Sequence, residues 1–261
     1  MNFNLAEKIR KHDYERYFCS LFAPEKLRNA LLALYAFNLE IAKTRESISE
    51  PMLGMIRLQW WREAIAEIYA GKPRRHEVVD ELAPLVKEFG LSEDLFLRMI
   101  DAREKDLDEY PPARLEDLWD YAEKTSSALL LLAAEILGCR NSGTEDFLIS
   151  LGRAWAACGL LRAAGYHLLP TQLFKDKGNE EKFAEGAKSL AAAINIETEK
   201  CRAILGAMDK DAKKALRPVS GLLAFLDVYM KRMKKRGYKI LRHKIEEPRF
   251  PILVRVVISS F

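Results

Sequence analysis

The sequence predicts an all-α protein, and three observations lead to this prediction. Apolar residues recur with helical periodicity along nearly the whole chain, and no stretch alternates apolar and polar residues as a half-buried strand does. Proline- and glycine-containing breaks interrupt this pattern, as at Pro24, Ser49–Pro51 and Gly71–Pro73. The segments between the breaks span roughly 12–22 residues, a length suited to helices that cross a globular domain.

Six of these segments illustrate the predicted helices: Glu25–Glu46, Met52–Tyr69, Ser92–Asp108, Leu115–Leu137, Thr144–Ala164 and Glu180–Leu205. The first has Pro24 and Glu25 at its start, where the free amides and the helix dipole favour both residues. In the second, adjacent Trp60 and Trp61 point about 100° apart, so we expect only one of them to be fully buried. The third begins with Ser92, whose hydroxyl can cap the exposed amides.

The composition fits one soluble globular domain that spans residues 1–261. Apolar residues make up 49% and charged residues 31% of the chain, which provides a sizeable core and does not indicate disorder. The 42 basic and 38 acidic residues leave a net charge of +4. This excess is too small to predict a nucleic-acid partner. No repeat, low-complexity tract or linker divides the chain.

The cysteines and the N-terminal segment predict a cytoplasmic protein. Cys19, Cys139, Cys158 and Cys201 have neither metal-ligand nor disulfide-framework spacing, so we expect reduced thiols. The first residues lack the apolar core of a signal peptide. The longest apolar run, Ala128–Ala134, is far too short to span a bilayer.

Several blocks of the sequence resemble the squalene/phytoene synthase superfamily in their order and spacing. These blocks are RYFCSLFAPEKLRNALLALYAF, LQWWREAIAEIYAG, YAEKTSSALLLLAAEILG and LGRAWAACGLLRAAGYHLLP. The resemblance is clear over residues 14–170 and looser beyond. It implies an isoprenoid-synthase-like helical bundle around a central cavity. In the enzymes of this superfamily, aspartates on two facing helices bind Mg²⁺, which holds the substrate diphosphates and helps them leave.

The positions of both aspartate-rich motifs carry other residues in this chain. The first motif falls on Ala42, Lys43 and Glu46, and the second on Ala163 and His167. One carboxylate therefore remains, and a lysine adds positive charge where the metal would bind. Because Mg²⁺ prefers charged oxygen ligands, we expect neither synthase activity nor a cofactor. Magnesium would be expected only for an active prenyltransferase with other ligands.

The sequence is most similar to the complex I assembly-factor branch of this superfamily and its bacterial relatives. The segments that carry this resemblance include DYERYFCSLFAP, YAFNLEIAKTRESISEPMLGMIRLQWW and DAREKDLDEY. It implies a non-catalytic protein that assists assembly of NADH dehydrogenase, with a complex I subunit or assembly protein as partner. The expected location is cytoplasmic and peripheral on the inner membrane, or the matrix side for a mature organellar form. The alternatives are an active prenyltransferase and a prenyl- or lipid-binding module.

Five charged residues are candidates for lining a relic of the prenyl cavity: Glu40, Arg45, Glu46, Arg162 and His167. One interpretation is an anionic lipid or prenyl compound held through the two arginines. The interpretation that we favour is internal pairing of arginine with glutamate, which would satisfy charges left by the lost metal site.

Asp101, Glu104 and Asp108 form the densest acidic cluster and lie on one helical face. A replacement metal site there is one interpretation. Lys105 and Arg103 interrupt the cluster, however, so we favour a solvated face with ion pairs.

The segment Asp227–Lys244 is basic, and apolar residues interleave with its cations. Such a segment can lie on anionic lipid, gaining about 1 kcal/mol per cation near the surface. The candidates for this contact are Lys231, Arg232, Lys234, Lys235 and Arg236. The alternative is a solvated basic face, and RNA binding is disfavoured because the chain has no nucleic-acid fold signature.

Overall fold

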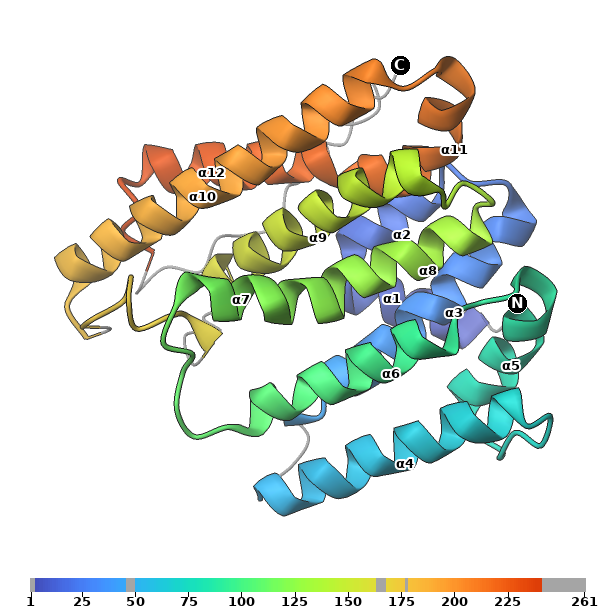
Figure 1. The fold of residues 1–261 in the computed structure, drawn as a ribbon. Coiled ribbons are helices and arrows are strands. Elements are labelled where there is room, and N and C mark those ends of the chain that lie inside the picture. Colours follow the sequence, from blue (N-terminus) through green and yellow to red (C-terminus); the bar gives the residue numbers. More distant parts are fainter. Residues whose placement is uncertain (1–2, 46–49, 163–167, 177, 241–261) are drawn as a thin grey trace. The chain divides into compact units, whose positions relative to one another are not determined.

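The computed structural model describes residues 3–45, 50–162, 168–176 and 178–240 (Figure 1). Every regular element within these ranges is a helix, which confirms the predicted all-α class. The chain divides into two compact units. Unit 1 comprises Met1–Asp108, Ala128–Glu145 and Met208–Val219, and unit 2 comprises Glu109–Ser127, Asp146–Ala207 and Ser220–Phe261. A single domain around a central cavity remains a prediction.

Unit 1 is built around one central helix. Its helices are α1 (Phe3–His12), α2 (Tyr14–Ser20), α3 (Glu25–Ala42), α4 (Pro51–Tyr69), α5 (Glu77–Phe89), α6 (Glu93–Ala102), α8 (Ala128–Ile136) and most of α11 (Lys210–Ser220). Helix α3 packs against α1, α2, α5 and α8, and every residue in its stretch 30–39 is buried. Burial on all faces is expected for a helix that lies inside a core. Helix α4 lies at the edge of this unit and packs against α5 and α6 (Figure 1).

Local sequence signals explain where α4 and α5 begin and end. Pro51 occupies the first turn of α4, where its missing N–H costs no hydrogen bond. Helix α5 begins after His76 and ends at Gly90, which has a left-handed φ of 62°. Glycine suits this position because a Cβ atom would strain the left-handed backbone. The helix predicted over Ser92–Asp108 is shorter, since α6 passes into a 3₁₀ segment, η2 (Arg103–Leu107), after Ala102.

The prediction that Ser92 caps α6 through its hydroxyl is wrong. Ser92 lies at the N-cap position, but its side chain makes no capping bond. Its hydroxyl donates to Glu135, and its amide donates to the same carboxylate at 3.0 Å. Arg140 also binds Glu135 and donates to Glu145 at 2.9 Å. The hydroxyl oxygen itself accepts a hydrogen bond from Arg140 at 3.2 Å, so the Ser92 side chain is held by the Glu135–Arg140 pair and does not accept from the helix amides.

An aromatic cluster joins α3, α4 and α6. The ring of Phe37 lies 5.4 Å from that of Trp61 and 5.2 Å from that of Phe96, both in edge-to-face contact. Trp61 is only 1% exposed, whereas Trp60 is partly exposed. The prediction that one of the adjacent tryptophans is fully buried is therefore confirmed.

Unit 2 contains the remaining long helices. They are α7 (Leu115–Ala122), the π-helical segment η3 (Glu123–Ser127), most of α9 (Ser142–Arg162), α10 (Glu180–Ala207) and α12 (Leu222–Lys235). The predicted helix 115–137 thus includes a π-helical turn that periodicity does not reveal. Arg153 of α9 donates to Glu123 at 2.8 Å and to Glu197 at 3.3 Å, which links η3, α9 and α10.

All four cysteines of the chain are buried free thiols. Burial raises the pKa of Cys139 to about 11 and the pKa of Cys201 to about 12. The pKa of Cys19 is also raised, chiefly by burial. Thiols of this kind are inert because only the thiolate is a good nucleophile.

Candidate functional site

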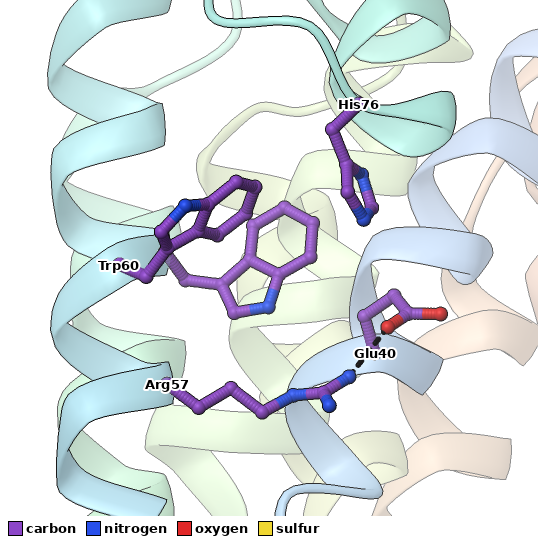
Figure 2. A pocket seen from close by; sticks show the side chains of 5 residues that line it. Glu40, Arg57, Trp60 and His76 are labelled. Atoms are coloured by element: carbon purple, nitrogen blue, oxygen red, sulfur yellow. Dashed lines mark hydrogen bonds and ion pairs between the residues drawn. The ribbon is translucent and has the colours of Figure 1, made fainter.

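A pocket of about 210 Å³ opens on unit 1 (Figure 2). It is lined by Glu40 of α3, by Arg57, Trp60 and Trp61 of α4, and by His76 at the start of α5. The three α4 residues are spaced i, i+3 and i+4, which places them on one side of the helix. Three helices therefore meet at this pocket.

The aromatic rings of the pocket hold one another in place. The ring of His76 lies 5.2 Å from both tryptophan rings, and the tryptophan rings lie 5.0 Å apart. The guanidinium of Arg74 covers Trp60 at 5.0 Å from the ring centre, and Glu67 in turn binds Arg74 at 2.6 Å. This cation–π contact and the ring contacts fix one wall of the pocket.

Glu40 is the acidic group of the pocket, and two cations hold it. Lys8 binds one carboxylate oxygen, and Arg57 donates to the other at 2.6 Å. Burial by itself would raise the pKa of Glu40, but the hydrogen bond from Lys8 and the charges of Lys8 and Arg57 outweigh it and lower this pKa. Glu40 is therefore ionised at neutral pH.

His76 contributes a hydrogen-bond donor to the pocket. Its Nδ1 atom accepts the backbone N–H of Val78 at 3.2 Å and so caps α5. An accepting Nδ1 carries no proton, and the neutral ring then carries its proton on Nε2. Figure 2 shows the ring extending from the start of α5 into the pocket, toward Glu40.

The chemistry of the pocket is suited to groups that accept hydrogen bonds. Among the described lining side chains, Arg57 and His76 supply charged or ring N–H donors and Glu40 is the one carboxylate, whose charge Lys8 helps to balance from outside the lining. Among the described residues, no serine, threonine or cysteine lines the pocket to act as a nucleophile. The arrangement therefore supports binding more directly than catalysis.

A model of the protein family described as squalene/phytoene synthase matches residues 9–253 of this chain. The chain belongs to the squalene/phytoene synthase family. Its fold agrees with this assignment. The structure superimposes on a solved dehydrosqualene synthase with a TM-score of 0.78 and 18% sequence identity, over 99% of this chain and 96% of the synthase chain.

Named relatives within the family include complex I assembly factors. The chain is 38% identical to human NADH dehydrogenase (ubiquinone) complex I assembly factor 6 over 161 residues, which are 62% of this chain and 48% of the human protein. The homologue in Dictyostelium discoideum is 26% identical over 98% of this chain and 76% of its own length. The chain thus spans about half the length of the human relative that it matches.

The expectation from the family resemblance places the first metal-binding motif at the end of α3. Ala42 is the last residue of this helix, and Lys43 follows at its C-cap. A methyl group and an ammonium group cannot ligate Mg²⁺, so these two positions do not fit the metal. Glu46, Ala163 and His167 lie outside the described residues. Within the described part of the chain, no three His, Cys, Asp or Glu side chains gather as metal ligands.

Three of the five residues predicted to line a relic cavity are described by the structure, and each has different neighbours. Glu40 lines the pocket, but Arg45 does not; its guanidinium donates to the backbone carbonyl of Asp106 and to that of Asp108 at 3.4 Å. Arg162, at the end of α9, lies 3.6 Å from the ring centre of Tyr229. Glu40 pairs with Arg57, which was not among the five candidates, and the expected pairing of glutamate with Arg45 or Arg162 remains a prediction.

Asp101 and Glu104 of the acidic cluster are held by one arginine, whereas Asp108 has extended backbone after η2, so the prediction of one helical face is wrong for Asp108. Arg62 of α4 donates to Asp101 at 2.7 Å and also binds Glu104. Arg103 binds Asp106 at 3.3 Å. The interpretation as an ion-paired face therefore describes this cluster better than a metal site. Sequence spacing missed Arg62 as the main partner because it comes from another helix.

The basic C-terminal segment uses its apolar side in the fold. Tyr229, Met230 and Met233 of α12 are buried. Of the five cationic candidates, Lys231, Lys234, Lys235 and Arg236 are exposed and Arg232 is half-buried. Because the apolar side chains of α12 are buried in the fold, only its cations could contact a bilayer. The apolar face that an amphipathic helix inserts into lipid is not exposed here. None of the helices in the described ranges is long and apolar enough to cross a membrane.

The residues that sequence reasoning missed are Lys8, Arg57 and His76. The pair Trp60–Trp61 drew attention as LQWWREAI, and Glu40 stood among the candidates. Arg57 directly precedes this block, so its place on the tryptophan side of α4 was available from helical spacing. Lys8 and His76 come from other helices, and no local signal connects them to the pocket.

Proposed function

We propose that this member of the squalene/phytoene synthase family does not condense prenyl diphosphates and instead assists assembly of respiratory complex I. The feature that carries the proposal is the end of α3, where the family resemblance would place the metal-binding motif and where this chain has Ala42 and Lys43. The 38% identity with human complex I assembly factor 6 supports the assembly role.

Elementary electrostatics explains why these residues oppose synthase chemistry. A departing diphosphate carries several negative charges, and the enzymes neutralise them with Mg²⁺ held by aspartates. Lys43 places a fixed positive charge at a ligand position, which repels a divalent cation. A lysine can attract the diphosphate, but it cannot replace the bridging metal shell.

The partner that we propose is a subunit or assembly protein of NADH dehydrogenase. The location that we propose is the surface of the membrane in which that complex is assembled. The exposed cations at the end of α12 support an electrostatic contact with anionic lipid, which should weaken as salt rises. No cofactor belongs to this function.

Two assays test the proposal together. Purified protein is incubated with Mg²⁺ and farnesyl diphosphate, and pyrophosphate release is measured with a catalytically active family synthase as control. In parallel, the gene is deleted in its own cells, and assembled NADH dehydrogenase is measured on native gels with and without re-expression. We expect no pyrophosphate release and a loss of assembled complex that re-expression restores.

The two assays fail in different ways. Pyrophosphate release above the protein-free control would establish the prenyltransferase alternative, with ligands other than those of the first motif. Normal assembly of NADH dehydrogenase in the deletion strain would refute the assembly role. A prenyl or other lipid that co-purifies in equal amount with the protein would instead favour the lipid-binding module.

A further inference from the structure

The first two turns of α4 expose a cluster of large apolar side chains. Met52, Leu53, Met55 and Ile56 are exposed, Met52 at 72% and Ile56 at 60%, whereas Gly54 is buried. At 100° per residue the four apolar residues lie within an arc of about 160° that is centred opposite Gly54. Contiguous apolar surface of this kind marks interaction sites in soluble proteins.

The exposed face leads directly to the pocket. Ile56 and Trp60 are one helical turn apart, and Trp60 is a wall of the pocket (Figure 2). In the pocket, both oxygens of Glu40 already accept hydrogen bonds, from Lys8 and Arg57. The Nε2–H of His76 adds a further donor. Lys8 and Arg57 thus place two positive charges beside the single carboxylate of Glu40, and a carboxylate from a partner would balance the excess charge.

We propose that Met52, Leu53, Met55 and Ile56, together with the pocket, form a docking face for an apolar segment of a partner protein that carries a carboxylate. The partner's apolar side chains cover the first turns of α4, and its carboxylate enters the pocket beside Arg57 and His76. The identity of the partner as part of NADH dehydrogenase or its assembly rests on the proposed function. The methionines suit this role because their flexible side chains adapt to the shape of a partner.

The polar residues around the docking face favour a protein over a lipid surface. At helical spacing, Gln59 and Glu63 continue the same face of α4, and the Gln59 amide donates to the Glu63 carboxylate at 3.2 Å. Glu63 is exposed and would be repelled by anionic headgroups. An apolar centre with a polar rim is the usual anatomy of a protein interface.

A second copy of the chain is a poorer occupant. In a symmetric pair the same surface meets itself. The apolar residues of the docking face bring no carboxylate of their own, and Glu63, which follows on the same face, already accepts a hydrogen bond from Gln59.

Site-specific photo-crosslinking tests the docking face in the full chain. The photoreactive residue p-benzoylphenylalanine replaces Ile56, and in a matched control it replaces Ile196 of α10, which is 70% exposed. After irradiation of living cells, the crosslinked peptide is sequenced by mass spectrometry. We expect position 56 to capture one apolar segment that contains Asp or Glu, and position 196 not to capture it.

A second substitution tests the carboxylate. Adding Arg57→Gln should lower the crosslinking yield at position 56 at least about tenfold, because a hydrogen bond between charged groups is lost. Arg57→Lys, which keeps the charge, should retain part of the yield. Thermal unfolding of each variant shows whether the fold survives the change. An unchanged yield in folded Arg57→Gln would overturn the carboxylate contact.

Other products overturn the proposal as well. These are a crosslink to a second copy, a crosslink to phospholipid, a captured segment without Asp or Glu, or no crosslink. Co-flotation with phosphatidylglycerol vesicles that Ile56→Ser abolishes would assign the face to lipid. If the captured acidic segment belongs to a protein unrelated to NADH dehydrogenase, the docking face stands and the proposed assembly function fails. Loss of the assembled complex on deletion, with no crosslink at position 56, would support the assembly function and refute the docking face.

Discussion

The single residue Glu40 of α3 connects two neighbouring helices at the pocket. Its carboxylate binds Lys8 of α1 and Arg57 of α4, and the side chain is only 13% exposed. Because the pKa of Glu40 is lowered, the charged form is the one that the fold stabilises. Removing this charge would leave two cations beside a half-buried amide.

We therefore expect Glu40→Gln to lower the free energy of unfolding at pH 7 by about 1–3 kcal/mol, since two hydrogen bonds between charged groups are weakened. The contribution of Glu40 is present above its ordinary pKa of 4.5 and is lost as the pH falls through the lower pKa of the folded state. The wild type should thus lose stability on acidification more steeply than the variant. Urea unfolding at neutral and acidic pH measures both effects.

Glu88→Gln provides the control for this experiment. Glu88 pairs with Lys26, whose side chain is 75% exposed. An exposed pair of this kind contributes about 0–1 kcal/mol. Equal losses in the two variants would contradict the special role of Glu40.

Whether the sequence predicts the contacts of a single residue depends on how far apart the two partners are along the chain. Glu40 was a candidate because it lies in the helix that leads to the first motif. Its partners Lys8 and Arg57 are 32 and 17 residues away. No periodicity or motif relates residues at such separations, because only the packing of three helices brings them together.

Among the helices, α9 contains three glycines, and two of them have opposite surroundings. A Cβ atom added at Gly152 would lie 2.5 Å from the backbone of Ser127, so η3 approaches α9 closely at this point. The hydroxyl of Ser127 donates to the carbonyl of Ile149 at 2.9 Å and fixes this approach. A Cβ atom added at Gly159 would meet no atom of the described residues within 4 Å.

These surroundings predict opposite effects of the same substitution. Gly152→Ala should lower the free energy of unfolding by about 1–3 kcal/mol, because backbone atoms must move apart. Gly159→Ala should raise it by up to about 1 kcal/mol, because alanine reduces the entropy of the unfolded chain. Urea unfolding of both variants at one pH gives the comparison. Two changes of the same sign would show that η3 does not restrict Gly152.

Helix positions were more predictable than the irregular turns within them. The helices predicted over Met52–Tyr69 and Glu180–Leu205 are seen as α4 and α10 with nearly the same ends. The 3₁₀ segment η2, the π-helical segment η3 and the Ser92–Glu135 bond were not predicted. Each depends on contacts with other elements, which a pattern with a period of 3.6 residues does not contain.

For the whole molecule, the question is whether the two compact units unfold together. The chain passes between them five times along its length. Each unit therefore contains segments that are distant in sequence, and neither is a continuous stretch that could be cut free. This arrangement favours the single domain that the composition predicts.

The buried thiols make this prediction testable. Cys19 and Cys139 belong to unit 1, and Cys158 and Cys201 belong to unit 2. In one cooperative domain, all four should become reactive to a maleimide at the same urea concentration. Pulse labelling followed by mass spectrometry reports each cysteine separately. Separate midpoints for the two pairs would establish two independently unfolding units.

The all-α class and the family were predictable for the whole chain because both follow from the order of helical blocks. The pocket was not, because its lining residues come from α3, α4 and the start of α5 and share no motif. The exposed turn of α4 was equally hidden, since Met52–Ile56 reads as an ordinary apolar helix start. Sequence alone does not distinguish an apolar residue in the core from one at the surface.

The burial of every native thiol also leaves the folded chain without a cysteine that reagents in solution can reach. A cysteine introduced at Met52 would be the single thiol open to a dye, and none of the four native cysteines would need to be replaced first. One fluorophore at the edge of the docking face could then follow the arrival and departure of a partner in real time.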